Sequence, residues 1–161
     1  LVYFFVRVRG LNSAAEDRRA EQQVLVHYQA AFQQAGFQTA DADGPLRAVA
    51  LNAEQDYAAY RQTMLERLEQ SGEVTLAVIG EIDLCAPEQD ASGSLVQGRA
   101  QLEVRDLVAG KLITSWCADN AIRRRTLTEA SYFILDKVAL NSARSLAADT
   151  LRDWQQTGGK S

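Results

Sequence analysis

The chain has 161 residues, 47% hydrophobic and 24% charged, and its formal net charge is −4 with a sequence pI of about 5.0. This profile is typical of a single globular domain and excludes general disorder. The net negative charge does not favour binding to nucleic acid or to an anionic membrane surface. No apolar run in the sequence is long enough to span a membrane.

The N-terminal stretch alternates with a period of two, which predicts a strand over residues 2–9. One face carries Val2, Phe4, Val6 and Val8, and the other carries Tyr3, Phe5, Arg7 and Arg9. Because the chain begins without Met inside an apolar run, we expect residues 1–155 to form one α/β domain cut from a longer protein. We expect residues 156–161 to be a flexible tail.

Capping patterns and apolar periodicity predict three helices. They begin near Ser13, Asn52 and Thr126 and end near Gly36, Gly72 and Trp154. Breaker residues at 41–45 separate the first helix from a short alternating segment, 46–51, which we interpret as a second strand. In the last helix, Ala139, Ala143 and Ala147 form a ridge of small residues that allows a helix to approach a sheet closely.

The stretch from Glu73 to Cys117 has the clearest strand pattern in the chain. Period-two segments at 74–85 and 99–105, a tight turn at 108–111 and a returning segment at 112–117 predict a three-stranded antiparallel meander. The whole order is then β-α-β-α-β-β-β-α. This order predicts an α+β fold of the anticodon-binding-like kind, a two-layer mixed sheet with its helices mainly on one face and the other face open.

Three segments resemble a class of bacterial cell-envelope domains. These segments are Gly80-Glu81 at the end of an apolar strand, Val104-Arg105-Asp106 before the turn residues Gly110-Lys111, and the Ala-rich last helix. The class includes the middle domain of a flagellar assembly protein, the amino-terminal domain of the Tol-system propeller protein, and the curli-secretion and penicillin-binding-protein-activator lipoproteins. The resemblance implies a domain that binds partners or assembles into rings and has no catalytic residues.

Glu81 and Asp83 project from one strand face, a spacing that suits paired carboxylates in acid–base chemistry or a hard cation. Arg99 and Arg105 are predicted on the same face, so a solvated cross-strand ion-pair ladder is the favoured interpretation. The acidic segment 88–90 lacks the glycine-centred spacing of a calcium loop. We therefore predict no metal and no cofactor.

Cys85 and Cys117 are the only cysteines. Counting from the turn places Cys117 near Leu102 and Cys85 beside the start of the middle strand, an offset that a disulfide tolerates only with a bulge or a longer loop path. Free thiols are favoured, and a bridge stays open. The single histidine, His27, is expected to be partly exposed and not catalytic.

The aromatic and basic side chains of the open face are the predicted partner-binding residues: Tyr3, Phe5, Arg7, Arg9, Arg99 and Arg105. We expect a non-catalytic interaction or assembly module of a periplasmic or outer-membrane-associated protein, whose partners are other envelope proteins or further copies of itself. The alternative is a cytoplasmic domain that binds nucleic acid or a ligand on its sheet face. The basic run 123–125 is expected to be solvated, although docking of a phosphate or an acidic partner there stays open.

Overall fold

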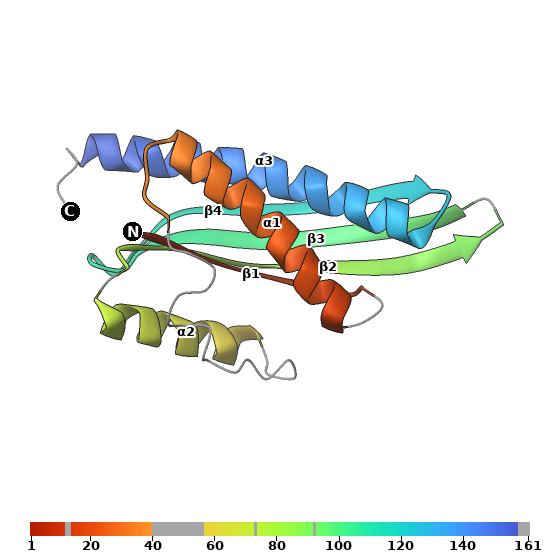
Figure 1. Ribbon diagram of the computed structural model, residues 1–161, viewed down its shortest axis with the longest axis horizontal. Helices are drawn as coiled ribbons and strands as arrows, with labels where there is room; N and C mark the ends of the chain where they lie inside the picture. Colours follow the sequence, from red (N-terminus) through yellow and green to blue (C-terminus); the bar gives the residue numbers. More distant parts are fainter. Residues whose placement is uncertain (12–13, 40–56, 73, 92, 158–161) are drawn as a thin grey trace.

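The computed structural model describes residues 1–11, 14–39, 57–72, 74–91 and 93–157 (Figure 1). Within these ranges the strands are β1 (Val2–Arg9), β2 (Leu76–Asp90), β3 (Gly93–Asp106) and β4 (Lys111–Arg124). The helices are α1 (Ala14–Gln34), α2 (Tyr57–Ser71) and α3 (Leu127–Gln156). None of these helices combines the length and the apolar content needed to cross a membrane.

The four strands form one mixed sheet in the order β1-β2-β3-β4. β1 runs parallel to β2, whereas β2, β3 and β4 are antiparallel neighbours. The α+β class, the mixed sheet and the antiparallel meander are therefore confirmed. The described elements follow the order β-α-α-β-β-β-α, and the predicted strand at 46–51, the breakers at 41–45 and the caps at Ser13 and Asn52 lie outside the described residues.

The meander is longer than predicted. The segment between the two period-two stretches, for which no strand was predicted, is largely strand: β2 continues to Asp90 through a bulge between Cys85 and Glu88, and β3 starts at Gly93. Pro87 falls within that bulge, where its missing N–H does not interrupt the ladder. β4 continues past Cys117 to Arg124, so Arg123 and Arg124 of the basic run belong to the sheet, and the run is exposed, as predicted.

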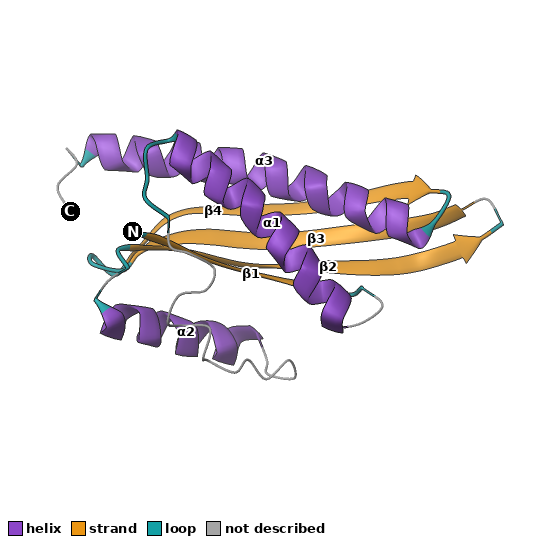
Figure 2. Cartoon of the chain, viewed as in Figure 1, coloured by secondary structure: helices purple, strands orange, loops and turns teal. Residues whose placement is uncertain are grey.

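The main core lies between one face of the sheet and the helices α1 and α3 (Figure 2). Phe4 of β1 packs against Phe32 of α1 with ring centroids 5.3 Å apart. α3 approaches the sheet at Gly98, where an added Cβ would lie 2.4 Å from Cγ2 of Ile134. The predicted ridge of small residues in α3 is buried, as this close approach requires: Ala139, Ala143 and Ala147.

The opposite face of the sheet carries α2, so the expectation of an uncovered face is wrong at that end (Figure 1). Leu65 and Leu68 of α2 are buried against Ala77 and Ile79 of β2. The physical reason is hydrophobic burial. α2 has an apolar stripe, and this end of the sheet also has apolar side chains on this face, so packing the two together removes both from water.

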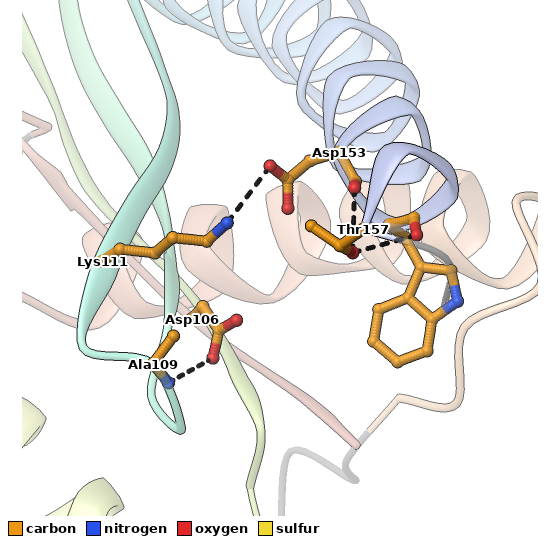
Figure 3. Close-up of polar contacts among 6 residues, drawn as sticks. Asp106, Ala109, Lys111, Asp153 and Thr157 are labelled. Atoms are coloured by element: carbon orange, nitrogen blue, oxygen red, sulfur yellow. Dashed lines mark hydrogen bonds and ion pairs between the residues drawn. The ribbon is translucent and has the colours of Figure 1, made fainter. Parts of the chain in front are cut away.

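The predicted tight turn between β3 and β4 is confirmed, and it lies beside the end of α3 (Figure 3). Asp106 accepts hydrogen bonds from the backbone N–H groups of Val108 and Ala109, both at 2.9 Å, and Gly110 has a φ of 66°. Lys111 Nζ lies 3.4 Å from Asp153 Oδ1. The start of β4 is thus tied to the last turns of α3.

Candidate partner-binding face

The side of the sheet that bears α2 is called the second face here. Strand register arranges its side chains in rows that run across the sheet from β1 to β4. The rows are Tyr3–Ala77–Arg105–Leu112, Phe5–Ile79–Glu103–Ser115, Arg7–Glu81–Gln101–Cys117 and Arg9–Asp83–Arg99–Asp119. All six predicted partner-binding residues lie on this one face, although in different environments.

Tyr3 and Phe5 occupy the end of the face that α2 covers. Both are half-buried and pack against the apolar cluster that includes Leu65 and Leu68. Burial raises the pKa of the Tyr3 hydroxyl. These two aromatic side chains therefore contribute to an intramolecular core, and any contact that they make with a partner stays a prediction.

Arg105 is also engaged within the chain. Its Nε donates to Glu103 Oε1 at 3.3 Å, and Nε of Arg61 in α2 donates to the same oxygen at 2.6 Å. Glu103 thus joins β3 to α2 through the guanidinium group of Arg61, while Arg105 is its neighbour on the same strand. These polar contacts lie beside the apolar contact between α2 and the sheet.

Arg7 and Glu81 form a nearly buried ion pair in the next row. Arg7 is 9% exposed, and its Nε donates to Glu81 Oε2 at 2.8 Å while Nη2 contacts the same oxygen. The expected ladder does exist, but its pairing differs from the prediction. The parallel register of β1 and β2 places Arg7 directly beside Glu81, whereas Arg99 pairs with Asp119 of β4. The charge of Glu81 is therefore balanced by Arg7 of the same chain.

The fourth row is charged and open, and is called the charged row here: Arg9, Asp83, Arg99 and Asp119. Its charges alternate in sign from β1 to β4. Arg99 Nη2 and Asp119 Oδ2 are 3.5 Å apart, and their side chains are 73% and 64% exposed. The pKa of Asp83 is raised to about 6, chiefly by partial burial and then by a hydrogen bond to Glu81 and the negative charge of that residue. Arg9 opposes this rise.

The two thiols flank the charged row on the same face. Cys85 and Cys117 are free and exposed, in line with the predicted offset. They pair with Gln97 and Gln101 of β3, so four residues, about 13 Å along the strand, separate their positions. Cys117 lies one residue from its predicted register, because the turn spans residues 107–110 and moves the pairing by two residues, and the register shift between Val104 and Arg105 restores one of them.

The remaining candidate groups lie apart from one another. His27 is partly exposed on α1, as predicted, with Nε2 3.6 Å from Asp136 Oδ1 of α3. The helices and the second face are separated by the sheet itself, so His27 is on the other side from both thiols. The acidic segment 88–90 belongs to β2. Among the described residues, no group of three His, Cys, Asp or Glu side chains is arranged to hold a metal ion.

Two features of the structure were missed from the sequence. One is the α2 cover, for which the apolar side chains Tyr3, Phe5 and Ile79 on the supposedly open face were the available signal. The other is Glu21 of α1, which accepts a hydrogen bond from the Val8 backbone N–H at 3.2 Å. Burial is the main cause that raises the pKa of Glu21 to about 6. No sequence pattern connects that residue with the edge of β1.

No protein-family model and no curated protein sequence matches the chain. The fold is similar to lipoprotein GNA1162 from Neisseria meningitidis, with a TM-score of 0.54 and 15% identity over 88% of this chain and 95% of that chain. It is also similar to a neuraminyllactose-binding hemagglutinin homologue from Helicobacter pylori, with a TM-score of 0.50 and 10% identity over 92% and 83% of the two chains. TolB from Acinetobacter baumannii matches with a TM-score of only 0.36 and 13% identity over 88% of this chain and 28% of that one. The chain therefore shares its fold with lipoprotein GNA1162 and with the hemagglutinin homologue.

Proposed function

We propose that this protein is a non-catalytic interaction module of the bacterial cell envelope and that it binds a macromolecular partner through the charged row. The observation that carries the proposal is the contrast between adjacent rows of the second face. The Arg7–Glu81 pair is nearly buried and satisfied, whereas Arg99 and Asp119 are mostly exposed and held only by a 3.5 Å contact. Exposed charges of alternating sign set the orientation and the rate of docking for a complementary surface.

The envelope setting is the broader part of the proposal. It is supported by the fold that the chain shares with lipoprotein GNA1162 from Neisseria meningitidis. In this setting the module is periplasmic or associated with the outer membrane, as in the flagellar, Tol and curli-type domains that its motifs resemble. Its partners are other envelope proteins.

The nucleic-acid alternative is less well supported. Stacking of bases on a sheet requires exposed aromatic side chains, whereas Tyr3 and Phe5 pack against α2. The charged row contains as many carboxylates as guanidinium groups, so it does not form a basic track for a phosphate backbone.

The experiment is affinity capture from an envelope extract of the source bacterium with the protein as bait. The test variant is Arg9→Glu/Arg99→Glu, and the matched control is Arg18→Glu/Arg152→Glu, which changes net charge equally at exposed helix positions. We expect a partner that the wild type and the control retain, that high salt releases, and that the test variant loses. Equal retention by both variants would refute docking at the charged row.

A further inference from the structure

The outward side of α3 combines exposed apolar and basic side chains. Phe133 and Leu140 are 44% and 38% exposed. Lys137 lies between them and Arg144 follows one turn after Leu140, and both cations are exposed. With 3.6 residues per turn, these four side chains project within an arc of roughly 60°. Arg124, the last residue of β4, lies over the Phe133 ring with its Cζ 4.4 Å from the ring centroid. These five residues are called the α3 strip here.

The carboxylates of α3 lie to either side of this strip. Asp149 accepts a hydrogen bond of 3.0 Å from a threonine of β4, and Asp153 lies 3.4 Å from the lysine that begins β4. Glu129 and Asp136 project on the flank nearer α1, where Asp136 Oδ1 lies 3.6 Å from His27 Nε2. The α3 strip itself has three cations and no carboxylate, in a chain whose net charge is −4.

The charges of α1 are divided in the same way. Asp17 and Glu21 are turned toward the end of β1, where each accepts a hydrogen bond from a backbone N–H. Arg19 and Val26, seven residues apart, project together from the exposed side of the helix, and Val26 is 63% exposed. The outward side of the helical layer is therefore basic and partly apolar along both helices.

An anionic lipid surface complements this arrangement. Lipid phosphates supply the opposite charge, and the boundary between headgroups and acyl chains accepts apolar side chains next to basic ones. The aliphatic stems of Lys and Arg can lie in apolar surroundings while their charged ends reach the phosphates. α3 packs on β3, β4 and α1, and it runs along one margin of the molecule (Figure 2). A helix in this position can lie flat on a membrane.

We propose that the α3 strip docks this domain on an anionic lipid surface. Phe133 and Leu140 enter the boundary between headgroups and acyl chains, and the three cations contact lipid phosphates. The sheet separates α3 from the second face, so the charged row points away from the lipid. Docking on lipid uses no residue of the charged row, and this proposal stands independently of the proposed function.

Sedimentation with vesicles tests the role of the cations. The probe is vesicles of phosphatidylethanolamine and phosphatidylglycerol, and vesicles of phosphatidylcholine are the comparison without net charge. The test variant is Lys137→Glu/Arg144→Glu, and the matched control is Arg9→Glu/Arg99→Glu, which makes the same charge change on the other side of the sheet. We expect the wild type and the control to bind anionic vesicles only, and high salt to release them. Each cation adds about fivefold in affinity, so the test variant should bind at least about 25-fold more weakly.

Two results of the sedimentation experiment would overturn the proposal. One is a wild-type protein that does not bind anionic vesicles, and the other is equal binding by Lys137→Glu/Arg144→Glu. In affinity capture, a protein that this variant loses while it still binds vesicles would assign the strip to an acidic protein and would also overturn the proposal. Arg9→Glu/Arg99→Glu should lose the captured partner and keep the vesicles, so the two proposals fail separately.

A fluorescent label tests whether the apolar side chains enter the lipid. In the Cys85→Ser/Cys117→Ser background, Leu140→Cys carries a maleimide dye whose emission depends on polarity. We expect its emission to shift to the blue with anionic vesicles, whereas the same dye on Asp119→Cys, on the second face, should not change. Phe133→Ala should weaken vesicle binding severalfold with an unchanged circular dichroism spectrum. An unshifted dye at position 140 in vesicle-bound protein would contradict the proposal.

Discussion

Gly98→Ala tests how closely α3 packs on the sheet. Gly98 is buried in β3, and a Cβ placed there would lie 2.4 Å from Cγ2 of Ile134 and 3.3 Å from Cδ2 of Leu84. The first distance is far below a normal carbon–carbon contact, so α3 or the Ile134 side chain must move. Overpacking of this kind costs about 1–3 kcal/mol, against a gain of roughly 0.5–1 kcal/mol from replacing a strand glycine. We expect Gly98→Ala to lower the free energy of unfolding by a net of about 1–2 kcal/mol.

Urea denaturation of a double-mutant cycle isolates this contact. Ile134→Ala alone should cost about 2–5 kcal/mol, because Ile134 is 2% exposed and its truncation leaves a cavity. In Gly98→Ala/Ile134→Ala the added methyl group enters space that the isoleucine has vacated. The double variant should therefore be more stable than the sum of the single losses predicts, by about 1 kcal/mol or more. Additive losses, or a Gly98→Ala variant as stable as the wild type, would refute the close approach of α3.

Three further predictions concern stability. Arg7→Met should lower the free energy of unfolding by about 1–3 kcal/mol, because the nearly buried Glu81 carboxylate is left without its cation. Arg7→Met/Glu81→Leu, which removes both charges, should recover most of that loss; urea denaturation measures both variants. Glu21 has a raised pKa in the folded state, so its ionisation lowers the free energy of unfolding as pH rises from about 4.5 to above 6. Glu21→Gln should therefore be more stable than the wild type by about 1 kcal/mol at pH 7, and thermal melts should show that the gap has closed below about pH 4.5. Leu68→Ala should cost about 2–4 kcal/mol and increase amide hydrogen exchange in α2 more than in α3, and equal increases in both helices would contradict the separate packing of α2.

Local sequence patterns were sufficient to identify β1, part of the meander and the three described helices. Alternation identified β1 and the meander, and the alanine ridge identified the helix that approaches the sheet. The pattern failed between Cys85 and Gly98, where Pro87 and a polar run have the composition of a loop. There the β-bulge accommodates the proline, and Val96 continues the buried face of the strand. A local pattern does not reveal a bulge, because it depends on the neighbouring strand.

Long-range placement could not be predicted from the same patterns. The apolar stripe of α2 was recognised, but which sheet face it covers is decided by competition among apolar surfaces from distant segments. The Arg7–Glu81 pair likewise depends on the parallel register of β1 and β2, whose residues are 74 positions apart. The six predicted partner-binding residues share one face as expected. Tertiary packing divides them into a covered group and an exposed group.

The most direct test of the charged row as a docking surface is the alkylation rate of Cys85 with and without the captured partner. Cys85 is an exposed thiol two residues beyond Asp83 on the same face, next to the charged row. In the Cys117→Ser background, a maleimide reacts with Cys85 alone. We predict that bound partner slows this reaction severalfold and that high salt restores it. An unchanged rate with the partner bound would contradict docking on the charged row.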